Sequence, residues 1–341
     1  NTGIFTASTD VDAGSIGTDT VFAIFDADST DIALPLTGVE TFIADLDSGN
    51  DGSEQYDFDV DGATGLENLV LFTGTSGASV DVDDYVSTIT VQLGADGDTA
   101  GSTSTSVFEN SSALDIFPTS TSGTADVVNL ALYDTDDKAG TIDIDAAGVE
   151  TVNIAVSTDA ESHKLDLAGV TATSGSKVTL NVTGGVSTDG IELTATSSTI
   201  TTIAAADYLG TVTITDRNSA AMTITTGTGV DSLRMENSAD VIDSGSGADT
   251  LVVAKELILG GLSVDLTSTT DQISTFNGSS NSAVQKGFRH VDLSNVTGSF
   301  GGDVTAAAAG SNITGTKNKD QITLGTDATK EIFSMDDFRE L

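Results

Sequence analysis

Several residue types are missing or scarce in this chain of 341 residues. It has no cysteine, no tryptophan, only two prolines and 5% aromatic residues. Without cysteine, neither disulfide bonds nor thiolate metal sites can contribute to the fold. Without tryptophan, the chain is poorly suited to a groove that stacks sugar rings. No apolar run approaches the length of a membrane span, and no signal peptide is visible.

Basic side chains are also scarce, and the first part of the chain has none. All 12 Lys and Arg residues lie at or after Lys138, against 52 Asp and Glu residues overall, and the net charge is −40. This balance argues against nucleic acid and membrane insertion and favours cations as partners. Residues 1–137 hold 26 of the carboxylates. We therefore expect an irregular acidic β-region at 1–137 and a repeat-built region at 138–341.

Small and β-forming residues make up much of the rest. The chain has 36 glycines, with abundant Thr, Ser, Val and Ala, which is typical of short strands joined by tight turns. Its hydrophobic content of 38% is too high for a disordered chain, and its length allows a continuous core. The sequence therefore predicts an all-β fold.

A nine-residue repeat occupies residues 226–252, where the chain reads TGTGVDSLR, MENSADVID and SGSGADTLV. Three kinds of residue recur in phase. They are glycine at Gly227, Gly229, Gly245 and Gly247, aspartate at Asp231, Asp240 and Asp249, and an aliphatic residue at Leu233, Ile242 and Leu251. Glycine permits tight turns, Asp supplies a carboxylate, and one aliphatic residue in nine points inward.

Each nine-residue unit is interpreted as half a coil, so that eighteen residues return the chain to the same side. The loop holding Asp231 should then lie directly above the loop holding Asp249, with Asp240 on the opposite edge. Stacked carboxylates and glycine carbonyls make an oxygen-only cage that suits Ca²⁺. The alternative is a Gly/Asp-rich loop that binds no metal.

Longer repeats surround this stretch. The segments beginning at Ile200 and Arg289 align as two copies of one module, which places Asp320 in phase with Asp231 and predicts a degenerate unit at 312–325. Strand openings with glycine, an apolar residue and usually glutamate recur at Gly38, Gly65, Gly148 and, as a variant, Gly287. The whole chain is therefore expected to consist of one kind of strand and turn.

The nine-residue repeat resembles the G-G-x-G-x-D-x-U-x repeat of RTX proteins. Its setting among modules such as ITGTKNKDQI resembles the RTX-type calcium-binding surface-layer proteins of Gram-negative bacteria. The resemblance implies a parallel β-solenoid with a β-roll at 226–252, bound Ca²⁺ and type I secretion to the cell surface. It also implies self-assembly, with anchoring to cell-surface polysaccharide through a part that this chain does not contain. Since the chain starts at Asn1, we expect a segment or a processed product.

Paired aspartates are the main feature of the acidic region. Asp-x-Asp occurs at Asp10/Asp12, Asp26/Asp28, Asp45/Asp47, Asp57/Asp59/Asp61, Asp81/Asp83, Asp96/Asp98 and Asp134/Asp136, with Asp143/Asp145 just beyond. On a strand, the two carboxylates of a pair share a face about 6.6 Å apart and repel each other. We therefore expect divalent cations to be part of the fold here.

The segment DFDVDG contains the sharpest local candidate, Asp57, Asp59 and Asp61, and it matches the opening of an EF-hand loop. The twelfth position is Asn68 instead of the bidentate Glu, so a calcium site of another kind or an acidic sheet face is favoured. A solvated loop remains a third interpretation.

Enzyme chemistry has little support. The two histidines, His163 and His290, occur in unrelated contexts, and no zinc-protease, serine-hydrolase or phosphate-loop motif is present. A carboxylate pair for glycoside hydrolysis remains open because Asp is abundant. We expect a structural protein, a calcium-dependent surface-layer lattice, with a calcium-binding RTX adhesin or biofilm-matrix protein as the alternative.

Overall fold

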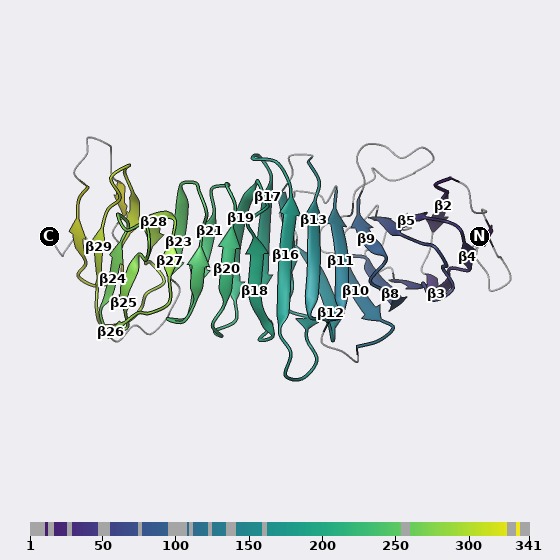
Figure 1. The fold of residues 1–341 in the computed structure, drawn as a ribbon, viewed down its shortest axis with the longest axis horizontal. Coiled ribbons are helices and arrows are strands. Elements are labelled where there is room, and N and C mark those ends of the chain that lie inside the picture. The colour runs from purple at the N-terminus through teal and green to yellow at the C-terminus, as the bar shows by residue number, and fades with distance from the viewer. Residues whose placement is uncertain are drawn as a thin grey trace. The chain divides into compact units, whose positions relative to one another are not determined.

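The computed structural model describes residues 11–12, 17–25, 29–46, 55–73, 77–94, 108, 112–121, 125–133, 141–158, 162–253, 260–325 and 332–334. Its secondary structure is all-β, as predicted, and the main sheets are parallel (Figure 1). Within these ranges there is no helix with the length and apolar character of a membrane span. The chain divides into two compact units, Asn1–Ile200 (unit 1) and Thr201–Leu341 (unit 2), which are described separately.

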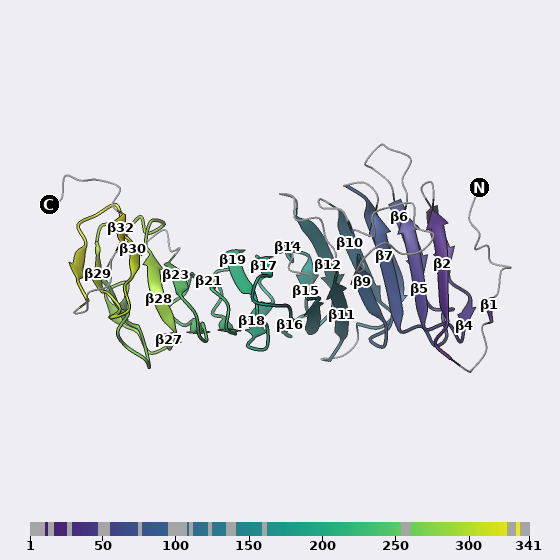
Figure 2. The same ribbon diagram turned by 90° about the horizontal axis from the view of Figure 1, so that it is seen from above.

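Unit 1 is a parallel β-solenoid in which the chain alternates between two sheets (Figures 1 and 2). In its first sheet the order is β2 (Thr20–Phe25), β5 (Thr41–Leu46), β7 (Asn68–Thr73), β9 (Thr90–Leu93), β11 (Val127–Leu132), β13 (Thr151–Val156) and β16 (Val178–Gly184). In its second sheet the order is β3 (Ser29–Ala33), β6 (Gln55–Asp59), β8 (Ser79–Tyr85), β10 (Ala113–Pro118), β12 (Ile142–Ala147), β14 (Ser162–Asp166) and β17 (Gly190–Ala195).

Three short strands complete unit 1. The strand β15 (Val170–Thr171) pairs with β12, and β1 (Val11–Asp12) pairs with β4 (Leu36–Thr37). Within unit 1, the described strands before residue 138 therefore pair in the same parallel manner as those after it. The Asp-x-Asp pairs at 26/28, 96/98 and 134/136, and one member of the pairs at 10/12 and 45/47, lie outside the described residues.

The core of unit 1 consists of inward-facing apolar columns that run from coil to coil. Residues alternate between the two faces of each strand, so one face can be buried while the other meets solvent. The pairing register aligns one column through Phe42, Leu69, Val91, Leu130, Ile154 and Val182, all of them buried. Such stacking removes a continuous apolar strip from water.

The recurrent glycine–apolar–glutamate openings form the corners of the coils. Gly38 and Gly148 have φ angles of 68° and 81°, which only glycine adopts without strain. The apolar residue that follows each glycine is buried. At two of these corners the glutamate caps the preceding coil, because Glu40 accepts the amide of Asp19 at 2.7 Å and Glu150 accepts that of Asp126 at 3.1 Å.

An asparagine ladder lies on the outward face of the first sheet of unit 1. Asn153 donates a side-chain hydrogen bond to Asn129 at 2.8 Å, and Asn181 donates one to Asn153 at 2.8 Å. Asn129 itself donates to the carbonyl oxygen of Ser87 at 2.8 Å. The amides thus pair with one another from coil to coil.

Unit 2 also has two rows of parallel strands. In one the order is β18 (Ile200–Ala205), β20 (Thr223–Thr226), β22 (Val241–Asp243) and β27 (Gln285–Lys286). In the other it is β19 (Thr211–Arg217), β21 (Ser232–Met235), β23 (Asp249–Val253), β28 (Phe288–Asp292), β30 (Asn312–Thr314) and β32 (Ile332–Ser334). The chain alternates between these sheets through the nine-residue repeat, so each half-coil supplies one strand.

A third sheet belongs to the later part of unit 2. Its order is β26 (Ser279–Ser280), β25 (Ile273–Phe276), β24 (Leu262–Asp265), β29 (Gly302–Thr305) and β31 (Gln321–Thr323). The contacts of β25 with β24 and β26 are antiparallel, whereas β24, β29 and β31 pair in parallel. The β-roll pattern therefore gives way to another arrangement after β23.

Candidate metal centre

The loops of Asp231 and Asp249 lie on neighbouring coils. Leu233 of β21 pairs with Leu251 of β23, and Ile224 of β20 pairs with Ile242 of β22, so equivalent residues are eighteen positions apart. Asp240 precedes β22 in the other sheet. The predicted half-coil arrangement is therefore present, with Asp231 and Asp249 on one edge and Asp240 on the opposite one.

In each of these stacked loops, an aspartate is buried with one of its oxygens unpaired. Asp231 is 1% exposed and Asp249 is 0% exposed. The Oδ1 of Asp231 accepts the amide of Val212 at 2.8 Å, and the Oδ1 of Asp249 accepts the amide of Asp231 at 2.9 Å. Each Oδ2 is buried and has no hydrogen-bond partner within the described residues. A buried carboxylate oxygen is costly unless a hydrogen-bond donor or a cation compensates it.

Hydroxyl groups recur beside these carboxylates. Burial raises the pKa of Asp231, against the lowering influence of the Thr226 hydroxyl and the Val212 amide. Burial raises the pKa of Asp249 to about 6, and the Asp231 amide and the Ser244 hydroxyl oppose this rise. Thr226 and Ser244 are themselves eighteen residues apart. Each loop thus offers one carboxylate and one hydroxyl, an oxygen-only donor set that suits a hard divalent cation.

The repeat glycines are required by the close stacking of the loops. A Cβ added at Gly247 would lie 2.0 Å from the carbonyl oxygen of Gly229, and one at Gly245 would lie 2.1 Å from that of Gly227. The Gly227 carbonyl also accepts the amide of Ser246 at 3.0 Å. These four predicted residues therefore position the loops, since any side chain would force the coils apart.

Asp240 has different surroundings. Its Oδ1 accepts hydrogen bonds from the Arg217 guanidinium at 2.6 Å and from the Met222 amide at 2.9 Å. Its Oδ2 accepts the amides of Glu236 at 3.1 Å and Asn237 at 2.9 Å. Because both oxygens are occupied and a guanidinium supplies the positive charge, the structure gives Asp240 no free oxygen for a metal ion.

Asp320 lies in a half-buried loop before β31. Its Oδ1 accepts the amide of Gly302 at 2.7 Å, and its Oδ2 accepts the amide of Thr316 at 2.9 Å. The Thr316 hydroxyl lies 2.8 Å from Oδ1. Asp320 therefore joins two coils eighteen residues apart, as Asp249 does, but both of its oxygens have partners.

The aspartates of DFDVDG belong to an acidic sheet face. Asp57 and Asp59 are outward-facing on β6, and Asp61 follows in the turn. The carboxylates of Asp59, Asp61 and Asp84 have oxygens that all lie within 4.8 Å of one another, and Asp61 and Asp84 are exposed. The charge of Asp59 is the main cause that raises the pKa of Asp61. The three predicted residues thus do not form one cage, because Asp57 points into a separate column.

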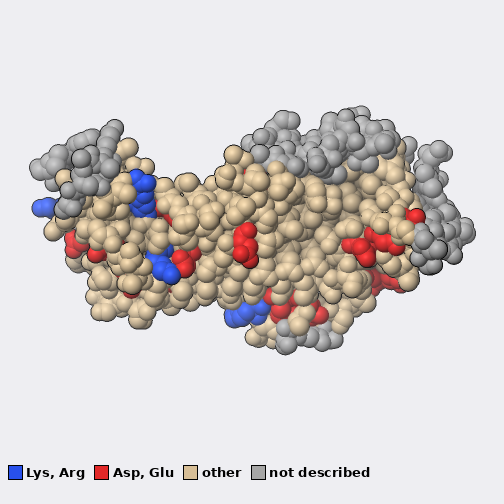
Figure 3. All heavy atoms as spheres, turned by 45° about the horizontal axis from the view of Figure 1, so that its top comes forward, with Lys and Arg blue, Asp and Glu red and all other residues tan. Residues whose placement is uncertain are grey.

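That column is an acidic ladder across the second sheet of unit 1. The register pairs Asp57 with Asp81, Asp81 with Asp115, and Asp115 with Asp145. Neighbouring strands lie about 4.8 Å apart, so these carboxylates are closer across strands than along one strand. Burial, together with the charges of Asp145, Asp81 and Asp143, raises the pKa of Asp115 to about 6. On the face in Figure 3, acidic side chains lie in patches among uncharged ones.

Sequence reasoning did not identify Thr226, Ser244 or Arg217. The two hydroxyls could have been found from the first position of the first and third repeat units. Arg217 precedes the repeat by nine residues and shares the phase of Thr226 and Ser244, but its residue type does not match the pattern of the repeat. The two histidines lie on strands: His163 on β14 is buried, and His290 on β28 is partly exposed.

No known protein family, curated protein or solved structure matches this chain. Its class is therefore defined by its own fold: an all-β protein built as a parallel β-solenoid.

Proposed function

We propose that this chain is a structural surface-layer protein that assembles with copies of itself into a calcium-dependent two-dimensional lattice on the cell surface, after type I secretion. The observation that carries the proposal is the stacked pair of Asp231 and Asp249. Each has a buried Oδ2 without a hydrogen bond of ordinary geometry in the described residues, and only a hydroxyl, of Thr226 or Ser244, opposes the effect of burial on its side.

Asp231, Asp249 and their neighbouring hydroxyls would hold the ion. Ca²⁺ accepts irregular sets of carboxylate, carbonyl and hydroxyl oxygens, and it would supply the positive charge that the buried carboxylates lack. The chain's own part is to bring these oxygens together: Gly229 and Gly247 allow the close approach of the loops, and the amide of Asp231 orients the Asp249 carboxylate.

Net charge supports a role for cations in assembly as well. At −40, copies of the chain repel one another over distances comparable with the Debye length. Ions that neutralise or bridge the acidic faces would remove this barrier. The regular outer faces of a solenoid then allow contacts between different patches on successive copies, and such contacts propagate instead of closing into a small oligomer.

Purified protein should be followed by light scattering and negative-stain electron microscopy as calcium is raised into the millimolar range. We expect soluble monomer in chelator, ordered sheets in calcium, and reversal when chelator is added. A variant carrying both Asp231→Asn and Asp249→Asn should require more calcium or fail to form sheets. Asp216→Asn is the matched control, because this side chain is 57% exposed and is not in the stacked loops.

A different outcome would favour the adhesin. If the protein stays monodisperse at high concentration over the whole calcium range and binds a specific glycan or receptor, the lattice proposal is overturned. If it neither assembles nor responds to calcium in any measurement, both proposals fail.

A further inference from the structure

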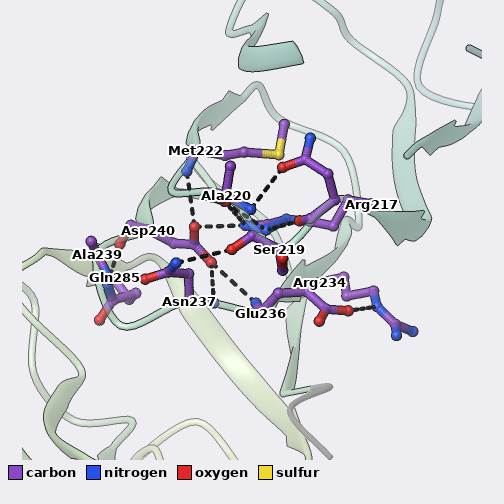
Figure 4. Close-up of polar contacts among 11 residues, drawn as sticks. Arg217, Ser219, Ala220, Met222, Arg234, Glu236, Asn237, Ala239, Asp240 and Gln285 are labelled. Carbon is purple, nitrogen blue, oxygen red and sulfur yellow. Dashed lines mark hydrogen bonds and ion pairs between the residues drawn. The ribbon is translucent and has the colours of Figure 1, made fainter. Parts of the chain in front are cut away.

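Arg217 is paired with Asp240, at the edge of unit 2 opposite the stacked pair, and Figure 4 shows the polar contacts of both side chains. Its side chain and that of Asp240 are both 0% exposed, and the Nη2–Oδ1 distance is 2.6 Å. The same guanidinium donates to the carbonyl oxygens of Asn218 at 3.0 Å and Ala220 at 3.3 Å. One carboxylate and two backbone carbonyls thus surround a buried positive charge.

Carboxylate and carbonyl oxygens are also the ligands that a hard divalent cation prefers. Asp240 also holds the same relation to the preceding coil as Asp249 does. It accepts the amide of Met222, eighteen residues earlier, just as Asp249 accepts that of Asp231. The difference is the second oxygen, which in Asp240 accepts two amides and in Asp249 has no partner.

We infer that the Arg217 guanidinium takes the place of a metal ion at this edge, so that the Asp240 loops are stable without divalent cations and become a cation site only when Arg217 is removed. Arginine stays protonated at any ordinary pH, so the compensation is permanent. A metal ion could displace it only by leaving a guanidinium buried and unpaired, which is costly.

The other described arginines support this role. Arg289 donates to the carbonyl oxygens of Gly310, at 2.8 Å, and Ala309. Arg234 donates to the carbonyl oxygen of Thr215 at 3.2 Å and to Glu236 at 2.6 Å. Each arginine within the described ranges therefore donates to backbone carbonyls, which lie in loops for Arg217 and Arg289 and on β19 for Arg234, and only Arg217 does so with its side chain fully enclosed.

The test is amide hydrogen exchange of the full chain in chelator and in millimolar calcium, read in peptides that contain Met222, Glu236 and Asn237. In the natural sequence, these amides should exchange at the same rate in both conditions. In Arg217→Ala they should exchange about tenfold faster or more in chelator, because a buried charge loses its partner, and calcium should restore their protection.

Two further variants test whether the charge of Arg217 is the cause of the protection. Arg217→Lys keeps the charge and should remain insensitive to chelator, with weaker protection because the lysine lacks the planar fork. Arg217→Met combined with Asp240→Asn removes both charges, and it should lose the response to calcium that Arg217→Ala gained. Retention of that response in the double variant would overturn the inference.

Two other results would also overturn it. The first is tenfold faster exchange of these amides in the natural sequence after chelation. The second is an Arg217→Ala protein that folds but gains no protection from calcium. If Arg217→Ala does not fold, the inference is still tested by whether these amides respond to chelator in the natural sequence and in Arg217→Lys. The exchange of loops 226–231 and 244–249 reports separately on the calcium site of the proposed function. If those loops do not respond to calcium, the peptides that contain Met222, Glu236 and Asn237 still test the role of Arg217.

Discussion

The main-chain amide of Asp231 donates a 2.9 Å hydrogen bond to the carboxylate of Asp249, the equivalent residue one coil later. The aspartate of each repeat thereby fixes the start of the strand in the coil before it. The same carboxylate keeps its other oxygen buried and unpaired. One side chain thus joins two coils and holds a negative charge between them, which explains why Asp recurs at this position with or without a bound ion.

Asp249→Asn should separate these two roles. Asparagine retains an oxygen that can accept the Asp231 amide, but it lacks the charge that a cation requires. We expect calcium affinity to fall by at least about tenfold, since loss of an outer-shell partner alone has such an effect at metal sites. Isothermal titration calorimetry measures the change, and Asp216→Asn serves as the control. Unchanged affinity in Asp249→Asn would remove this residue from the site.

The pH dependence of amide protection in loop 244–249 should have opposite signs in chelator and in calcium. Because burial raises the pKa of Asp249 from 3.8 to about 6, the folded chain binds a proton more readily than the unfolded chain between these values. In chelator, protection of loop 244–249 should therefore increase as the pH falls through about 6. In calcium it should decrease over the same range, because the ion competes with the proton.

Hydrogen exchange of that loop at about pH 7, 6 and 5 is the appropriate measurement, since Asp115 in unit 1 also has a raised pKa and would contribute to global unfolding. If the protection of this loop changes with pH in the same way in calcium and in chelator, no calcium ion binds at Asp249.

The coil geometry was predictable from the sequence because its cause is local. Nine-residue spacing of Gly, Asp and an aliphatic residue determines where the chain turns and which residue points inward. For this reason the placement of Asp231, Asp240 and Asp249 on alternate edges is confirmed. Gly38 and Gly148 were likewise visible as recurrent openings, and both have positive φ.

Two features could not be predicted from the nine-residue periodicity. Asp57, Asp81, Asp115 and Asp145 form one column although the spacings between them all differ. The partner of Asp240 is Arg217, twenty-three residues earlier and outside the repeat. In the column, insertions change the sequence distance while the sheet keeps the register. The phase that Arg217 shares with Thr226 does not indicate a pairing with Asp240.

Asn153→Ala should destabilise unit 1 more than Asn181→Ala. Asn153 takes part in two ladder hydrogen bonds, whereas Asn181 makes one with Asn153. At about 0.5–1.5 kcal/mol for each bond, the expected losses in unfolding free energy are about 1–3 and 0.5–1.5 kcal/mol. Denaturant unfolding compares the two variants, and equal losses would argue against a continuous ladder.

Gly247→Ala should be severely destabilising even when no calcium is present. The new Cβ would lie 2.0 Å from the Gly229 carbonyl oxygen and 2.6 Å from the Asp249 Oδ1, so the coils must separate. We expect a loss of about 1–3 kcal/mol or more, as for other overpacked sites. Gly261→Ala is the control, because nothing lies within 4 Å of its Cβ, and its cost should stay within about 0.5 kcal/mol. A neutral Gly247→Ala would mean that the loops do not stack so closely.

Asp115→Asn should stabilise unit 1 in chelator, because it removes the middle charge of the acidic ladder. Its neighbours in register are Asp81 and Asp145, and like charges about 5 Å apart repel by about 1–3 kcal/mol at the dielectric constants between water and a protein surface. The gain in unfolding free energy should shrink in calcium, which neutralises the column. It should shrink less in magnesium, which resists dehydration and irregular ligand geometry.

The control for Asp115→Asn is Glu192→Gln on β17 of the same sheet, because Glu192 pairs with Lys164 at 3.3 Å and its loss should bring no gain. Denaturant unfolding in chelator, calcium and magnesium measures both variants. High salt should reduce the Asp115→Asn gain, and so should a pH below about 6, where this carboxyl is already protonated in the folded chain. If Asp115→Asn is neutral in chelator, the carboxylates of the ladder are individually solvated, and the acidic face needs no cations to remain folded.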